Sequence, residues 1–516
     1  MNNRLKMTAR APPRGVIYGA LPPAGALATR RLVQFMPTTD AEYTYSGQNT
    51  FTIPINGPFW LDADQSYLSF DLVVEGKYTA NAGGSIPCAF MNSSVHNVFN
   101  QLEILGPSEN RIEHIPFYNQ IAATIHDARA GGEDDLASGG KGTGLIAARH
   151  GLGQTDGAGN GVGIIAPFNE EFTDTMIVQD ALAQDSTSAA ITEGFIFSNP
   201  STAVSSAAFV QLGKDTRCTV KLEAGTLKTG KYIPLISMVG KGLQLRLQLE
   251  NPNQVFSGFS AAAANRPAQL DDVQYTVKNV RFFASVVSMD DSINRQFLDI
   301  LSSQQLVQAH TESYLYSVRA LTLQTNQEAL FNINARSLNS VIAWTTPTEA
   351  WNNRNVDGIG FRYRDCLNSF QFRVNGVNYP ESRVELLTVN NDAGNASDLA
   401  CGSVYGTARA FQEFRKAMGT YKYHDKASRD TITAFGKSGF YMAQCLKAYP
   451  HDFSVIESGI DTATSATPIY LSMERATCIN GYSLASAIWN DNYLNMMGIC
   501  DMIVSYQFNG TAVASI

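Results

Sequence analysis

Apolar and polar residues alternate with a period of two in many short segments of this 516-residue chain. The pattern is cleanest at Leu243–Leu249, where every second residue is leucine and the residues between are glutamine or arginine. A period of two predicts β-strands with one face in a core and the other toward a wetter surface. The same pattern returns in both halves of the chain, with turns rich in Asp, Asn and Gly between the strands.

Residues 59–76 combine a predicted turn with a predicted strand. Asp62 and Asp64 can bond their own downstream amides, which favours a tight turn, and calcium binding is the alternative role for this pair. From residue 67 onward Leu68, Phe70 and Leu72 occupy alternate positions, and we expect them to face a core.

Strand patterns far outnumber helix patterns. In the first half we expect strands within residues 43–74, a hairpin at 98–112, and strands at 218–222, 232–239, 243–249 and 275–287. In the second half we expect strands at 317–323, 329–335, 340–345, 369–374, 440–448, 469–474 and 500–508. Helical spacing occurs at residues 116–129, 290–308 and 402–418. A parallel α/β sheet needs a helix after each strand, so the sequence predicts an all-β protein of two tandem antiparallel jelly-roll sandwiches.

The expected domain order follows from these patterns. Residues 1–40 are predicted to be a flexible basic arm, and residues 41–289 a first jelly roll with a long glycine-rich surface loop at 131–163. Residues 290–308 are predicted to be a linker helix, and residues 309–516 a second jelly roll.

The arm carries six basic residues and no acidic residue before Asp40. The basic residues are Arg4, Lys6, Arg10, Arg14, Arg30 and Arg31. The arm is either a solubilising tail or a segment that contacts nucleic acid, a membrane or a neighbouring protein.

Composition limits the other functions. Charged residues make up 16% of the chain, against about 25% in average globular proteins, which indicates that much surface is buried against other subunits. The net charge of −8 argues against a general nucleic-acid coat. The sequence contains neither a signal-peptide pattern nor an apolar run of membrane-spanning length, so synthesis in a cytosol or nucleus is expected.

Signals for catalysis are weak. The glycine-rich segment 140–143 lacks the spacing of a phosphate-binding loop, and the histidines are isolated from one another. Paired acidic residues at 133–135, 271–272 and 290–291 stand at predicted turns or helix starts, where a carboxylate has a local structural role. We therefore expect no enzyme, no catalytic residue, no cofactor and no metal site.

Three groups of residues resemble the first half of double jelly-roll major capsid proteins, most of all those of virophages, polinton-like viruses and related eukaryotic double-stranded DNA viruses. They are Pro58-Phe-Trp-Leu-Asp with Ser66-Tyr-Leu-Ser-Phe-Asp-Leu, then Phe99-Asn-Gln-Leu-Glu-Ile with Arg111-Ile-Glu-His-Ile, and finally Tyr232-Ile-Pro-Leu with Gly242-Leu-Gln-Leu-Arg-Leu. The resemblance covers residues 43–287 and weakens after them.

The resemblance implies a structural protein of the virion. Such proteins form homotrimers with a pseudo-hexagonal outline that tile an icosahedral capsid, beside penton and minor capsid proteins. It implies that the basic arm lies inside, against the genome or an internal membrane, and that no small-molecule substrate is bound. We also expect a chain without residues 1–39 to form a folded trimer that closes shells poorly.

Two other interpretations remain open from the residues. One is a capsid protein of an RNA virus, with one jelly-roll shell domain and a protruding β domain. The other is a tandem β-sandwich that binds carbohydrate or hydrolyses glycosides, which predicts secretion and an aromatic cleft.

Overall fold

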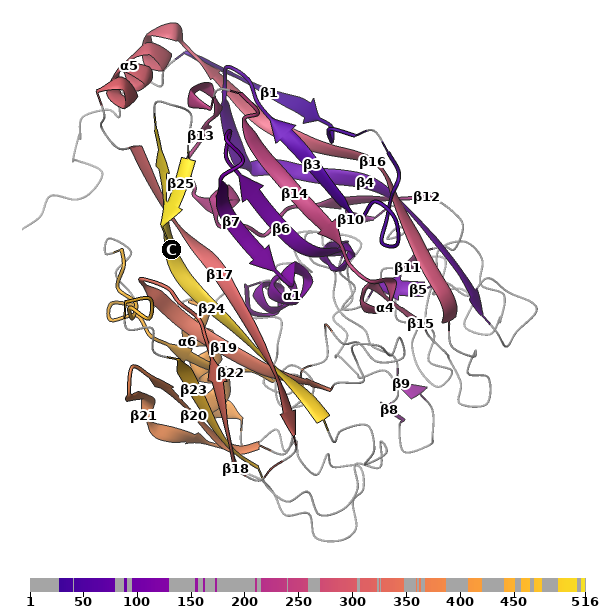
Figure 1. Ribbon diagram of the computed structural model, residues 1–516, viewed down its shortest axis with the longest axis vertical. Helices are drawn as coiled ribbons and strands as arrows, with labels where there is room; N and C mark the ends of the chain where they lie inside the picture. The colour runs from indigo at the N-terminus through magenta and orange to yellow at the C-terminus, as the bar shows by residue number, and fades with distance from the viewer. Residues whose placement is uncertain are drawn as a thin grey trace, which may run out of the picture.

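The computed structural model contains two β-sandwiches that follow one another along the chain (Figure 1). The structure describes residues 27–39, 41–78, 95–129, 215–238, 240–258, 270–303, 307–322, 326–347, 367–386, 407–419, 440–450, 456–464, 468–475 and 491–507, with short pieces between them. The predicted loop at 131–163 lies almost entirely outside these residues.

Two main sheets face each other in the first sandwich. One has the strand order β1 (Ala28–Phe35), β16 (Leu270–Met289), β4 (Trp60–Tyr78), β12 (Asp215–Val220) and β10 (Phe172–Thr173), with β2 (Tyr43–Thr44) and β13 (Ile233–Pro234) beside it. The other has the order β3 (Thr50–Ile55), β14 (Leu243–Leu249), β6 (Phe99–Leu105) and β7 (Arg111–Pro116). Small ladders join β11 (Phe209–Val210), β5 (Cys88–Phe90) and β15 (Phe256–Gly258), and β8 (Gln154–Thr155) with β9 (Gly161–Val162).

The second sandwich repeats this arrangement. Its first sheet has the order β17 (Val307–Thr322), β24 (Asp491–Tyr506), β19 (Leu338–Pro347) and β22 (Met442–Cys445), with β25 (Ala512–Ser515) paired to β24. Its second sheet has the order β18 (Asn326–Phe331), β23 (Ile469–Arg475), β20 (Leu367–Val374) and β21 (Val377–Glu385).

Both sandwiches have the connectivity of a jelly roll. If the eight long strands of each are numbered along the chain, one sheet has the order first, eighth, third, sixth, and the other second, seventh, fourth, fifth. All these pairs are antiparallel, as expected for two interlocked Greek keys. The predicted fold class is therefore confirmed.

The helices lie in the connections between strands of the antiparallel sheets. They do not form the crossovers that join parallel strands in an α/β sheet. Helix α1 (Tyr118–Arg129) and helix α6 (Ala408–Ala417) both follow the fifth strand of their sandwich, and α4 (Pro252–Val255) follows β14. Helix α5 (Asp291–Ser302) joins β16 to β17 at one end of the first sandwich (Figure 1). Single 3₁₀ turns lie at Val95–Val98, Thr226–Lys228 and Leu235–Ser237. The helix predicted at 290–308 is thus shorter than expected, because residue 307 already begins a strand.

Alternating side chains fill the first core as the sequence predicts. Leu245 and Leu247 on β14 are fully buried, and Leu245 lies between Ile53 of β3 and Ile104 of β6. Leu68, Phe70 and Leu72 on β4 are buried against the same core.

Three local expectations are wrong. Asp62 and Asp64 do not form a turn: β4 runs through both as one 19-residue strand. Residues 232–239 form only the two-residue strand β13 followed by a 3₁₀ turn. Residues 28–35, expected in a flexible arm, form β1, the edge strand that pairs with β16 from Ala28 to Phe35.

Candidate functional site

The structure describes two of the six predicted arm residues, Arg30 and Arg31 on β1. Arg30 donates from Nη2 to Asp62 Oδ2 at 3.0 Å and from Nε to Ser285 Oγ at 2.8 Å. Arg31 lies 5.6 Å from the ring centre of Phe59. Both arginines therefore bind to their own sandwich. Arg4, Lys6, Arg10 and Arg14 lie outside the described residues.

Asp62 thus has a non-local partner and not a turn amide. Because β1 pairs with β16 and β16 with β4, the Arg30 guanidinium reaches across one strand to the Asp62 carboxylate. Arg30 is half exposed, and exposed ion pairs contribute about 0–1 kcal/mol, so this contact orients β1 more than it stabilises it.

Among the described residues, no three His, Cys, Asp or Glu side chains gather in a way that could hold a metal ion. Within the same residues, no helix has the length and apolar character needed to cross a membrane. His96 is buried and bonds to the Tyr118 hydroxyl at 2.8 Å, and His310 bonds to Asp501 at 3.0 Å.

The two sandwiches meet at a buried polar interface, the polar seam, which is formed by Glu113, Gly225 and Thr226 of the first sandwich and Thr311 and Ser313 of the second. The Glu113 side chain on β7 accepts hydrogen bonds from the Gly225 and Thr226 amides at 3.0 and 2.8 Å and from the Thr226 hydroxyl at 2.7 Å. Its fourth donor is the hydroxyl of Ser313, on β17 of the second sandwich, at 2.8 Å. Hydrogen bonds to a charged group are worth about 1.5–3 kcal/mol each, so Glu113 holds three segments in one geometry.

Gly225 lets the backbones of the two sandwiches approach closely at this seam. A Cβ atom on Gly225 would lie 1.9 Å from the Glu312 carbonyl oxygen on β17. The Thr311 hydroxyl donates to the Gly225 carbonyl at 2.7 Å. Gly225 has a helical φ of −59°, so the contact, and not the backbone conformation, is what requires a glycine here.

A second contact of the seam uses aromatic rings and one arginine. Arg362 is fully buried, lies 4.8 Å from the Trp344 ring centre, and donates to Gln120 of α1 at 2.9 Å. The rings of Phe117 and Tyr316 approach to 4.8 Å between centroids. The Tyr316 hydroxyl donates to Asn495 at 2.6 Å, and burial raises the pKa of that hydroxyl above its usual range. Helix α1 is thereby held against the second sandwich.

Helix α5 is fixed to the first sandwich through Trp60 on β4. The Trp60 indole nitrogen donates to the Asn294 side chain at 3.0 Å, and its ring lies 4.5 Å from that of Phe297. Since α5 leads directly to β17, these contacts help to set where the second sandwich begins.

Glu250, at the end of β14, is a buried carboxylate of a different kind. It accepts from the Asn251 amide at 2.7 Å and from the Asn119 side chain of α1 at 3.0 Å. Burial outweighs these two bonds and raises the pKa of Glu250 to about 7. The same helix that contacts the second sandwich therefore also contacts a group that titrates near neutral pH.

Sequence patterns gave no sign of these residues. Glu113, Arg362 and Glu250 are single charged residues in or beside strands, where such a residue is usually exposed. Each is buried beside a partner that is distant in sequence: Ser313 for Glu113, Gln120 for Arg362 and Asn119 for Glu250.

No protein-family model matches the chain, and no curated protein matches it. Solved structures match it over nearly its whole length at low identity. PBCV-1 VP54, fitted into a reconstruction of the virophage Sputnik, is 10% identical with a TM-score of 0.54, over 97% of this chain and 99% of that one. A quasi-atomic model of the PBCV-1 virus capsid is 11% identical with a TM-score of 0.54 over the same shares. The Faustovirus major capsid protein is 10% identical with a TM-score of 0.54, over 95% and 92%. This chain therefore has the fold of double jelly-roll capsid proteins.

Proposed function

We propose that this chain is a major capsid protein whose homotrimers form pseudo-hexagonal capsomers of an icosahedral double-stranded DNA virus shell. The observation that carries the proposal is end-to-end similarity to capsid proteins, over 97% of this chain and 99% of PBCV-1 VP54. Two sandwiches of equal connectivity also fit it, because three chains then present six similar units around one axis.

The polar seam supports the same function. A capsid subunit that meets several neighbours must keep its two sandwiches at one angle. The directional hydrogen bonds that Ser313 donates to Glu113 and that Arg362 donates to Gln120 specify an angle better than apolar contact alone. An RNA-virus shell domain with a protruding domain fits less well, since the second sandwich is itself a complete jelly roll.

The finer parts of the proposal concern virus type and partners. Residues 58–62 with 66–72, the hairpin β6–β7, and residues 232–235 with 242–249 together resemble those of virophage and polinton-like capsid proteins most. Penton and minor capsid proteins are the expected neighbours, and residues 1–26 are the expected interior contact with genome or membrane. The protein would then act in the virion, after synthesis in a host cytoplasm or nucleus.

Native mass and particle shape test the proposal. Purified protein should have a mass of three 56.1 kDa chains, and negative-stain micrographs should show hexagonal outlines. A stable monomer at micromolar concentration, or a trimer of three-lobed and not hexagonal outline, would contradict it.

Two truncations separate the arm from strand β1. Removal of residues 1–26 should leave a folded trimer that closes shells poorly, because β1 is retained. Removal of residues 1–39 deletes β1 and uncovers the edge of β16, including the contacts of Val33 and Phe35 with the core. This second variant should aggregate or lose soluble trimer, which revises the expectation from sequence alone. Equal trimer yields from both variants would show that β1 is dispensable.

A further inference from the structure

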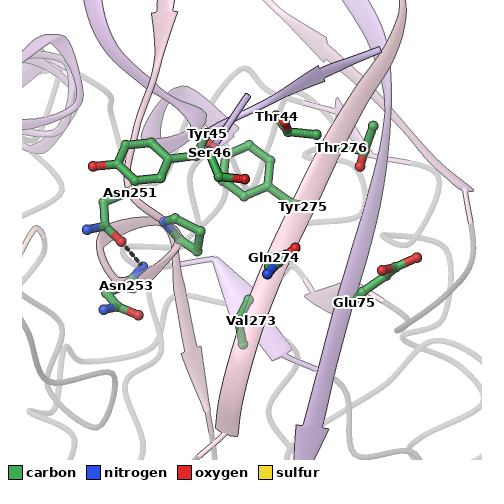
Figure 2. Close-up of a pocket in the computed structure, with 11 residues that line it drawn as sticks. Thr44, Tyr45, Ser46, Glu75, Asn251, Asn253, Val273, Gln274, Tyr275 and Thr276 are labelled. Carbon is green, nitrogen blue, oxygen red and sulfur yellow. Dashed lines mark hydrogen bonds between the residues drawn. The ribbon is translucent and has the colours of Figure 1, made fainter. Parts of the chain in front are cut away.

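A pocket of about 290 Å³ lies on the first sandwich, where β4 ends and β16 begins (Figure 2). Gln274 on β16 and Glu75 on β4 are paired neighbours in the sheet and form one wall. Tyr45 and the segment Asn251–Asn253 form the opposite wall. Its volume is at the lower end of the range for small-molecule sites, which suits a ligand of one ring.

The polar groups of the pocket are mostly uncharged. Asn251, Asn253 and Gln274 supply amides that both donate and accept, and Thr44, Ser46 and Thr276 supply hydroxyls. Among the described residues that line it, none is Lys, Arg or His, and Glu75 is the single carboxylate. Such a lining disfavours phosphate or another anion, which needs cationic partners. It suits a ligand with many hydroxyl groups and no charge.

The pocket also contains an exposed aromatic ring, that of Tyr45, and a rigid turn at Asn251–Asn253. Tyr45 is 41% exposed, so its ring offers an apolar surface to the C–H face of a ring-shaped ligand. The Asn251 side-chain oxygen accepts from the Asn253 amide at 3.0 Å, which fixes the side chain and leaves its NH₂ group to donate. Pro252 and Tyr275 are buried beneath, and the Tyr275 hydroxyl is bonded to the Glu250 carbonyl.

We propose that this pocket binds a neutral sugar residue, with Tyr45 against its ring and Gln274 and Asn251 bonded to its hydroxyls. Glu75, exposed beside Gln274, is positioned to accept from a further hydroxyl group.

The position of the pocket indicates which sugar source it meets. β1 begins at Ala28, opposite Met289 and next to α5, whereas the pocket is at the other end of β16, near Val273. This step rests on the proposed function: if the arm faces the capsid interior, the pocket end faces outward, toward glycans of the host surface. A single small polar site binds with a dissociation constant of about 1 mM, and the many copies on a shell multiply that weak binding.

Saturation-transfer NMR with purified trimer tests the site. The probes are methyl glycosides of glucose, galactose, mannose and N-acetylglucosamine, with glucose 6-phosphate as the anionic comparison. Tyr45→Ala and Gln274→Ala should each weaken binding at least tenfold. Tyr232→Ala is the matched control, because Tyr232 is 46% exposed but lies beside β13, at the opposite end of β4.

Loss of binding in both pocket variants, with binding kept in Tyr232→Ala, supports the inference. No binding of any neutral glycoside at about 10 mM, tenfold above the expected constant, overturns it. Binding that survives both pocket substitutions, or equal affinity for glucose 6-phosphate, also overturns it. Hexagonal trimers that bind no sugar would refute only this inference, whereas a sugar-binding monomer would refute the capsid function and leave the site standing.

Discussion

Glu250 should make the first sandwich less stable as the pH rises toward neutrality. Its pKa is raised from the usual 4.5 to about 7 in the folded protein. The folded state therefore binds this proton more tightly than the unfolded state, and stability is lost as the pH rises from about 4.5 to 7. One pKa unit corresponds to about 1.4 kcal/mol, so the full effect is about 3 kcal/mol for this buried group.

The Glu250→Gln substitution removes this titration and keeps the shape of the side chain. One of the two donors, Asn251 N or Asn119 Nδ2, then faces an NH₂ group, because the Asn119 oxygen already accepts from the Gln120 amide. That loss costs about 1–3 kcal/mol at every pH. The difference between variant and wild type across the pH range is therefore the informative quantity, and not the absolute stability at one pH.

Thermal unfolding of both proteins from pH 4 to pH 8 measures that difference. About 3 kcal/mol corresponds to about 6–12 °C for a sandwich of this size, so the wild-type midpoint should fall relative to the variant by an amount of that order. Glu328→Gln is the control, because Glu328 is half exposed and pairs with Arg373 on the surface. Parallel midpoint curves for wild type and Glu250→Gln would refute the reasoning.

Two further substitutions test the seam and the first core. Gly225→Ala should lower the free energy of unfolding by about 1–3 kcal/mol, because its Cβ would overlap the Glu312 carbonyl, and should speed proteolysis between the sandwiches. Gly230 lies in open space at a positive φ that Asn tolerates, so Gly230→Asn should change neither the free energy of unfolding nor the rate of proteolysis. An unchanged Gly225→Ala protein would show that the seam can open without cost. Leu245→Asp with Leu247→Asp should abolish soluble, folded protein, because each fully buried carboxylate costs several kcal/mol. Gln248→Asp on the same strand should be tolerated, and a normal yield of the double variant would place β14 outside the core.

The local periodicity of apolar residues was sufficient to predict those strands and helices whose structure is decided by neighbours in sequence. Leu243–Leu249 forms β14 with the predicted bounds, and the β6–β7 hairpin and helix α1 follow the expected order. In each case the apolar spacing within a dozen residues already states which face is buried. The number of such segments in each half also indicated two sandwiches, whereas the strand order within each is known only from the structure.

Periodicity failed where a distant segment supplies the missing partner. β1 contains Arg30 and Arg31, and its sequence resembles a polar arm. In the structure β16 provides the backbone hydrogen-bond partners of β1, and Asp62 forms an ion pair with Arg30. Asp62 in turn looks like a turn residue until that arginine is in place. Neither assignment is visible from composition, because the partner of each residue lies on a strand that is distant in sequence.

At the seam, a residue of one sandwich depends in the same way on a distant partner in the other sandwich. The Glu113 carboxylate is buried and needs all four of its donors, and one of them, Ser313, belongs to the other sandwich. A buried carboxylate without its partners is strongly unfavourable, whereas apolar surfaces tolerate sliding over one another. A seam of this kind therefore resists rotation of one sandwich against the other. For a capsomer, whose neighbours meet both sandwiches at once, resistance to that rotation is the property that assembly would require most.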